Sequence, residues 1–365
     1  MVNLLQIFLR RWTARSAWQS VLVVLLLSTG FSTMMAAPSR AAEFIRLFGE
    51  ENVGTAGAQF LRVPVGARAV AMGKAYSALA SDGATLFWNP AGIMRTPGRK
   101  NFFFSHTEYT AGIAMEHLSY HQRGQNFGYG LSAGVLRSGD ILRTDELHQE
   151  GTGQFFNANQ FYLGASVARA MTDRFSIGGT VKYFQENLDE YQTKAIFADL
   201  GILYFVGLGD TRIGFSVRNF GNDMQPVGTP AALSDGYVAA NDFQSFAAPT
   251  VGQFGAARTW QLSQKMGFLT SVDFAHPSDY KESFRMGGEL SLNKILFLRV
   301  GYETSRAEGG FATGFGVELK RKQMLLKVDY AYSDLGSFGT IHHISIDLSP
   351  LARRKDPDAW RRSGR

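Results

Sequence analysis

Between Asn101 and Leu348 the chain is a succession of segments in which apolar and polar residues alternate. In the segment 295–304, for example, Leu298 and Val300 flank Arg299. A period of two places the two sets of side chains on opposite faces of a β-strand. We predict about fourteen strands, at 101–109, 112–122, 126–138, 157–170, 175–188, 192–206, 211–219, 250–260, 266–276, 283–292, 295–304, 311–321, 324–333 and 340–348.

The connections between these strands alternate in length. Connections after even-numbered strands are short, as at 123–125 and 293–294, whereas most of those after odd-numbered strands are long and polar, as at 139–156 and 220–249. Single-chain bacterial barrels with both ends in the periplasm have an even strand count and short periplasmic turns. A soluble sandwich shares the alternation but gives no reason for sorting its loops. The pattern predicts an all-β fold, a transmembrane antiparallel β-barrel of about 14 strands.

The segment before the strands, 54–95, is apolar and rich in Gly and Ala. Its larger apolar residues recur at steps of three and four, which predicts a helix over 65–80 that ends at Ser81-Asp82-Gly83. The motif Asn89-Pro90-Ala91-Gly92 predicts a tight turn. We interpret the segment as a plug inside the barrel; the alternative is a buried helix and turn in a soluble domain. The plug and turn residues singled out are Gly66, Arg68, Met72, Gly73, Phe87, Trp88, Asn89, Pro90 and Gly92.

The strand face opposite the apolar set carries charges of both signs. Two interpretations are open: ion pairs that fill the lumen around the plug, or a charged translocation path. The balanced signs argue against a strongly ion-selective pore. These predicted lumen-facing charges are Lys182, Asp199, Arg212, Arg218, Asp273, Arg285, Glu289, Arg299, Glu303, Lys327, Asp329 and Asp347.

The ends of the chain have a different composition. Residues 1–41 combine a basic start with an apolar run, Val21–Leu27, which is too short to span a bilayer as a helix. We predict a signal peptide over 1–41, with a single membrane anchor as the alternative. The predicted organisation continues with a plug at 42–100, a barrel at 101–349 and a basic periplasmic tail at 350–365.

No constellation of residues predicts catalysis, a metal or a cofactor. The chain has no cysteine, which excludes thiolate metal sites and disulfides. His117 and His121 lie four apart beside Glu116, but a zinc motif with this spacing needs a helix and this segment is a predicted strand. Asp273 and His276 have no marked nucleophile nearby. The net charge of +6 lies partly in the leader and tail, so we expect no nucleic-acid partner.

Several stretches carry a resemblance to a known family. The letters GAQFL and GARAVAMGKAYSALASDGATLFWNPAG, followed by FSHTE at 104–108, MTDRFSIG at 171–178 and VDYAY at 328–332, resemble the PorV/PorQ-type outer-membrane proteins. These are relatives of the FadL-type transporters of hydrophobic compounds. The resemblance implies an integral protein of the outer membrane of a diderm bacterium, in contact with outer-membrane lipid.

The resemblance leaves the function open between two main hypotheses. A PorV-like barrel works with a secretion machine and receives exported cargo proteins at the cell surface. A FadL-like barrel takes up a hydrophobic small molecule past its plug, next to Phe87-Trp88; a third alternative is a purely structural barrel. The longest loop, 220–249, contains Phe243 and Phe246, and is expected to be either a binding surface or lid, or a cover packed over the barrel mouth.

Overall fold

The computed structural model describes residues 53–228, 243–304, 310–321 and 323–351. The predicted signal peptide, the start of the predicted plug segment, Pro230 in the longest loop and nearly all of the predicted tail lie outside this part of the chain. Within the described residues, no helix is long and apolar enough to cross a membrane.

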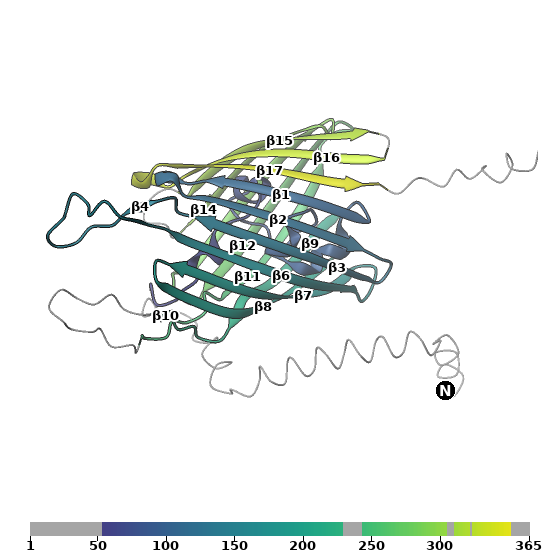
Figure 1. Cartoon of the computed structure of the whole chain (residues 1–365). Coiled ribbons are helices and arrows are strands. Elements are labelled where there is room, and N and C mark those ends of the chain that lie inside the picture. Colours follow the sequence, from purple (N-terminus) through teal and green to yellow (C-terminus); the bar gives the residue numbers. More distant parts are fainter. Residues whose placement is uncertain (1–52, 229–242, 305–309, 322, 352–365) are drawn as a thin grey trace, which may run out of the picture. The chain divides into compact units, whose positions relative to one another are not determined.

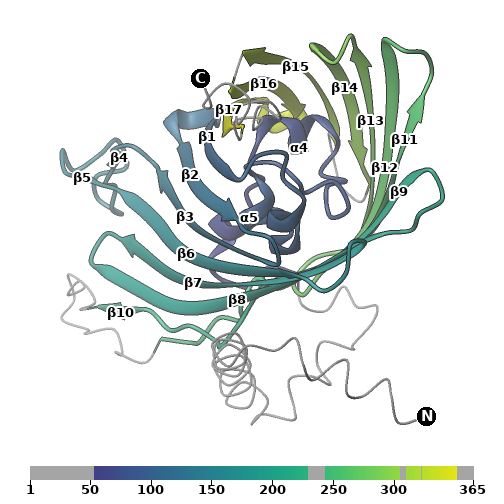
Figure 2. The ribbon, with the colours of Figure 1, turned by 90° about the vertical axis from the view of Figure 1, so that its right-hand side faces the viewer.

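Fourteen long strands form a closed antiparallel barrel (Figures 1 and 2). Each pairs with the next along the chain, and the last pairs with the first, from Phe102 opposite Leu348 to Glu108 opposite His342. The strands are β1 Lys100–Glu108, β2 Ala114–Arg123, β3 Phe127–Arg137, β6 Ala158–Ala170, β7 Phe175–Leu188, β8 Tyr191–Phe205, β9 Asp210–Gly221, β11 Val251–Gln261, β12 Met266–Pro277, β13 Ser283–Leu292, β14 Leu296–Glu303, β15 Phe311–Arg321, β16 Met324–Asp334 and β17 Thr340–Pro350.

The predicted barrel is confirmed, and every strand lies within two residues of its predicted bounds. The late start of β2 has a local cause: Thr110–Gly112 form a 3-10 turn, η4, in which Ala111 and Gly112 have φ of 59° and 72°. Short elements lie in the longer loops: the hairpin β4 Ile141–Leu142 with β5 Phe155–Phe156, the two-residue strand β10 Val227–Gly228 against β8, and η5 Gly336–Phe338.

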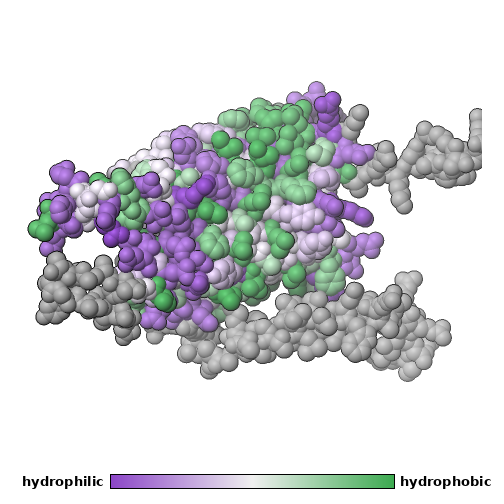
Figure 3. All heavy atoms as spheres, viewed as in Figure 1, coloured by the Kyte–Doolittle hydropathy of each residue, from purple (hydrophilic) through white to green (hydrophobic). Residues whose placement is uncertain are grey.

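The two faces of the wall differ in chemistry, as the alternation predicts. On β7, Ile177, Val181 and Tyr183 are exposed on the outside, whereas Ser176 and Lys182 are buried on the inside. The same holds around the barrel, so large apolar side chains such as Leu131, Phe254 and Val300 cover its outer surface. In the view of Figure 3 this hydrophobic surface is widest toward the end that carries the short turns.

Residues 54–99, which we call the plug segment, run inside the barrel (Figure 2). Its elements are η2 Gln59–Arg62, α4 Ala67–Ala71, α5 Thr85–Trp88 and η3 Pro90–Arg95. The predicted helix over 65–80 is wrong beyond α4, so the stop at 81–83 ends no helix. Gly73 and Lys74 have φ of 61° and 63°, which turns the chain where it meets the wall. The predicted turn is confirmed, because the Gly92 N–H donates to the Asn89 carbonyl at 3.0 Å, and η3 continues from it.

The charges separate between the two ends of the barrel. The short turns and adjacent strand ends, at 95–100, 123–127, 169–175, 205–212, 258–266, 292–296 and 319–324, form what we call the short-turn rim, at the right in Figure 1. Its described acidic residues are Asp173 and Asp210. Its described basic residues are Arg95, Arg99, Lys100, Arg123, Arg169, Arg174, Arg212, Arg258, Lys265, Lys294, Lys320 and Arg321.

At the opposite end, which we call the loop end, acidic residues dominate. The described loops and strand ends there, at 108–114, 137–158, 188–194, 220–228, 277–283, 303–304 and 334–340, carry basic residues at Arg137, Arg143, Lys194 and Lys281. The acidic ones are Glu108, Asp140, Asp145, Glu146, Glu150, Asp189, Glu190, Asp223, Asp279, Glu282, Glu303 and Asp334. Two of the basic residues are already in ion pairs, Arg137 with Glu116 and Arg143 with Asp189.

Two neighbouring glycines on β13 test how closely the plug segment fits the wall. A Cβ at Gly287 would lie 2.5 Å from the Met72 carbonyl oxygen, whereas one at Gly288, on the outer face, would approach nothing closer than 3.5 Å. Gly287→Ala should therefore lower the stability of the folded barrel by about 1–3 kcal/mol, the usual effect of overpacking. Gly288→Ala is the matched control. The midpoint of thermal unfolding of the purified protein measures both; equal midpoints would contradict the close fit.

Candidate functional site

Asn89 fixes the turn of the plug segment to the wall. Its side-chain amide donates to the carbonyls of Ser77 and of Ile202 on β8, both at 2.9 Å, and its Oδ1 accepts from the Ala91 N–H at 3.2 Å. The wall leaves room for it, because a Cβ at Gly201 would lie 2.1 Å from Asn89 Oδ1. One buried amide thus shapes the turn and joins it to the barrel.

The other turn residues are held just as closely. A Cβ at Gly92 would lie 1.8 Å from the Ala80 carbonyl oxygen, so only glycine fits there without movement of the backbone. Pro90 lies against β7, where a Cβ at Gly178 would approach its carbonyl carbon to 2.6 Å. Gly66, which has φ of 89°, donates its N–H to the Ser105 hydroxyl on β1 at 3.2 Å.

Arg68, on α4, joins the plug segment to the wall through a chain of charges. Its guanidinium makes two hydrogen bonds to Glu289 on β13, at 2.8 and 3.0 Å. Glu289 also accepts from Arg299 on β14 at 2.7 Å, and Arg299 donates to Asp329 on β16 at 2.6 Å. The chain of alternating charges therefore runs from the plug segment across four neighbouring wall strands, β13 to β16, with residues from three of them.

The same arginine reaches inward to Asp82 and Tyr76, two residues that the sequence pattern does not single out. Arg68 lies 3.3 Å from Asp82, and the Tyr76 hydroxyl donates to the same carboxylate. Burial raises the pKa of the Tyr76 phenol well above its ordinary value, so it stays protonated and remains a donor. Tyr76 falls in the helical period and Asp82 in the predicted stop, and both signals point to backbone structure rather than to an ion-pair network.

Wall carboxylates also satisfy backbone N–H groups of the plug segment. Asp273 on β12 accepts from the Ser77 N–H at 2.8 Å, and Asp347 on β17 accepts from the Gly83 N–H at 2.7 Å. Glu303 on β14 accepts from the Lys74 ammonium at 2.5 Å. Buried backbone donors outside regular structure need such partners. Asp273 and Asp347 therefore supply acceptors for N–H groups that the turns of the plug segment leave without one.

Most of the remaining predicted lumen charges are paired within the wall, whereas Arg218 lines a cavity. Lys182 lies 2.6 Å from Asp199 and donates to Asn219 at 2.9 Å, where β9 bulges and Asn219 has φ of 56°. Arg285 pairs with Glu303 at 2.8 Å. Lys327 pairs with Glu318 and Arg212 pairs with Asp210, at 3.1 and 2.6 Å.

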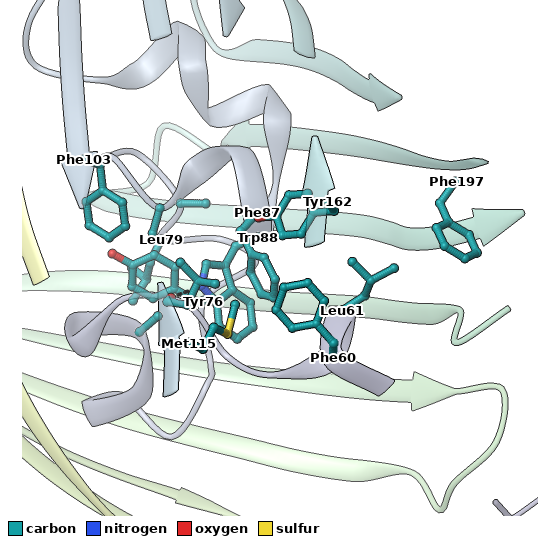
Figure 4. Close-up of a cluster of buried hydrophobic side chains, with 14 of the residues drawn as sticks. Phe60, Leu61, Tyr76, Leu79, Phe87, Trp88, Phe103, Met115, Tyr162 and Phe197 are labelled. Atoms are coloured by element: carbon teal, nitrogen blue, oxygen red, sulfur yellow. Dashed lines mark hydrogen bonds between the residues drawn. The ribbon is translucent and has the colours of Figure 1, made fainter. Parts of the chain in front are cut away.

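A cavity of about 740 Å³ lies between the plug segment and the wall at the loop end. Trp88 and Arg218 line its inner part, and the guanidinium of Arg218 lies 4.7 Å from the Trp88 ring and 5.0 Å from the Phe87 ring. Figure 4 shows Trp88 and Phe87 among the buried aromatic and aliphatic side chains of the plug segment and wall. The other lining residues include Val63, Pro64, Val70, Gly73, Lys74, Tyr109, Tyr280, Arg285, Glu303, Phe311, Ala312, Ser333, Leu335, Ile341 and His343. Apolar side chains such as Trp88, Phe311 and Ile341 thus share the lining with charges of both signs, which are Arg62, Lys74, Arg218, Lys281, Arg285, Glu303 and Asp334.

The described ends of the loop 220–249 are packed against the plug segment and the wall, as expected of a cover over the barrel mouth. Met224 and Phe246 exchange backbone hydrogen bonds at 2.9 and 2.8 Å, and the Gly57 N–H of the plug segment donates to the Ala247 carbonyl at 3.1 Å. Met224 is buried and Phe246 is exposed. Phe243 packs edge-on against Tyr191 with ring centroids 5.2 Å apart.

The histidines of the two patterns rejected as metal or catalytic sites lie apart, on β2 and β12. His117 and His121 point inward on β2, with His117 Nδ1 2.6 Å from the Tyr162 hydroxyl, whereas Glu116 lies 2.9 Å from Arg137. His276 Nδ1 lies 3.1 Å from Glu282. Among the described residues, no three histidine or acidic side chains converge as metal ligands would.

The amino-acid sequence is similar to an uncharacterised protein family. Residues 32–206 match the model of the uncharacterised protein family UPF0164. A UPF0164 protein of Treponema pallidum (strain Nichols) is 24% identical over 322 residues, which is 80% of this chain and 68% of the relative.

Two solved structures share the fold of the barrel. The chain is similar to the CymD monoaromatic hydrocarbon channel, at 12% identity and a TM-score of 0.54 over 80% of this chain and 98% of that one. It is also similar to the P. putida toluene transporter TodX, at 13% identity and a TM-score of 0.52 over 79% and 98%. At these identities the likeness concerns the fold alone, and it agrees with the predicted all-β antiparallel barrel.

The Arg68 network makes a prediction for how firmly the plug segment is held. Arg68→Met removes its charged contacts to Glu289 and Asp82, and breaking a buried pair costs up to about 3–5 kcal/mol. We expect a lower unfolding midpoint and a higher ion conductance across planar bilayers. Lys327→Met is the control, because it removes an inward cation of similar length that pairs only within the wall. Conductance that rises equally in both variants would contradict a specific role of Arg68.

Proposed function

We propose that this chain is an integral outer-membrane channel for the uptake of hydrophobic small molecules, with the plug segment as its movable closure. The cavity at the loop end carries this proposal. Its size falls within the range of small-molecule sites, which are mostly apolar with a few placed polar groups. Trp88 at its inner part belongs to the plug segment, so a ligand seated there would touch the element that closes the barrel.

The outer surface supports the location in a membrane. Outward side chains such as Leu118, Leu131 and Ile196 are 59%, 62% and 67% exposed, an arrangement that water disfavours and hydrocarbon accepts. The closed ladder leaves each long strand paired on both sides, which is the condition for strands in lipid. Both observations are those expected of an outer-membrane barrel.

The contacts of the plug segment support a gated path rather than an open pore. They include ion pairs and hydrogen bonds to wall side chains such as Glu289, Asp273 and Asp347, beside the apolar packing of Phe87 and Trp88. Water can replace the polar contacts with hydrogen bonds of its own, and a shift of the segment would leave the ladder of the barrel wall intact. The residues proposed to hold the closed state are the plug and turn residues predicted from the sequence, together with these wall acids.

The secretion hypothesis receives less support. The PorV/PorQ resemblance favoured receipt of exported cargo proteins, whereas the solved structures named above are a hydrocarbon channel and a toluene transporter. The cavity volume is also within the range of small-molecule sites, and it is small for an exported protein. Copurification from membranes separates the two: large protein partners would favour cargo handling, and a bound hydrophobic molecule without a protein partner would favour uptake.

Filling the cavity tests the uptake function. Ser333 on β16 lines the cavity, so Ser333→Trp should exclude the ligand and reduce uptake by about tenfold or more, the effect of about 1.4 kcal/mol on occupancy. Val328→Trp on the same strand faces outward and is the matched control. Entry of the fluorescent hydrophobic probe N-phenylnaphthylamine into vesicles that contain each protein is the measurement. Full uptake by Ser333→Trp would rule out this cavity as the entry site.

A further inference from the structure

The basic residues of the short-turn rim include a set that faces sideways, away from the lumen. By the alternation along their strands, Lys100 on β1, Arg169 on β6, Arg258 on β11 and Arg321 on β15 share the outer face with the exposed apolar residues. Their four strands are spread around the barrel. In the described strands, the outer apolar surface therefore ends at this rim in cationic side chains on several sides.

Two of these arginines lie on outward aromatic rings. The Arg258 guanidinium is 4.0 Å from the ring of Trp260, and the Arg169 guanidinium is 4.9 Å from the ring of Phe127, its direct partner across the β3–β6 ladder. Trp260 and Phe127 are 44% and 42% exposed. Aromatic rings of barrels gather at the level of the lipid headgroups, and each arginine here lies over such a ring.

We propose that the short-turn rim binds the phosphate headgroups of anionic phospholipids in the leaflet that it contacts. This inference rests on the proposed membrane location but goes beyond the uptake function. Cationic side chains at the edge of an apolar surface can reach a lipid headgroup with their charged ends, while the neighbouring apolar residues of the strand stay in hydrocarbon. The loop end has the opposite charge, so the attraction acts at one end of the barrel only.

The lateral direction of these side chains selects the lipid over a soluble acidic protein. A protein that docks beneath the barrel would meet the turns themselves, such as Lys265 and Lys294, and would gain little from cations stacked on rings at the side. Phosphate groups of a leaflet lie at the side, at the level of the outward rings. Arginine also suits phosphate, which its planar guanidinium can contact through two hydrogen bonds.

Quenching of Trp260 by brominated lipids tests the proposal. The full chain, with Trp12, Trp18 and Trp360 replaced by Phe, retains Trp260 at the rim and Trp88 buried in the plug segment. Brominated phosphatidylglycerol should compete for the surface beside Trp260 at least about fivefold better than brominated phosphatidylcholine, the effect of about one basic residue near an anionic surface. The preference should shrink as salt is raised, because salt screens exposed charges.

Two variants of equal charge complete the experiment. The rim variant replaces Lys100, Arg169, Arg258 and Arg321 by Gln and should lose most of the preference. The control replaces Arg137, Arg143, Lys194 and Lys281 at the loop end by Gln and should keep it. The shift of gel mobility on heating shows that each variant is a folded barrel.

The outcomes separate this proposal from the membrane location. Equal quenching by both lipids in the unmodified rim, or a preference that survives in the rim variant, would overturn headgroup binding while the barrel stays in the membrane. An acidic soluble partner would then be the better occupant of the rim. No quenching by either lipid would overturn both the membrane location and the rim proposal.

Discussion

The hydrogen bonding of the backbone is the constraint from which the rest of this structure follows. A strand that faces hydrocarbon needs hydrogen-bond partners for its N–H and C=O groups on both edges. A sheet provides them for every strand only when its last strand pairs with its first. β17 beside β1 completes that circle. Closure of fourteen strands encloses a space that wall side chains alone do not fill, and the plug segment occupies it.

The plug segment meets the same requirement by different means. It has few helical turns and no strand in the barrel, and side chains of the wall complete the backbone hydrogen bonding that its own turns leave open. Asp273 and Asp347 accept from its N–H groups, and Asn89 returns a bond to the wall carbonyl of Ile202. Wall glycines such as Gly287 and Gly301 let the two backbones approach. Several interior charges, among them Glu289, Asp273 and Asp347, are therefore tied to the fit of this one segment.

The sequence predicts the wall well and the interior poorly, for a physical reason. The alternation of polar and apolar residues marks each strand, and turn residues mark its ends. The strand bounds therefore follow from a few neighbouring residues of the sequence. The path of the plug segment depends on contacts with strands that lie about two hundred residues away, as for Arg68 with Glu289. Its helical period over 65–80 reflects burial on all sides, which small and apolar residues produce with or without a helix. The inward charges were predictable as a class, but their partners and the cavity were not, because pairing depends on strand neighbours and on where the plug segment lies.

The closing pair of strands also constrains how the molecule assembles. The plug segment precedes β1, and the seam that encloses it joins the first strand to the last. The segment must therefore already rest in the concave side of an open sheet before the seam forms, or else be threaded through a finished ring. The first route lets Gly287, Gly301 and the inward acids act as a template on which the sheet curls. On this route the pairing of β1 with β17 is a late event. It is also slow, because it joins parts of the chain that are far apart in sequence.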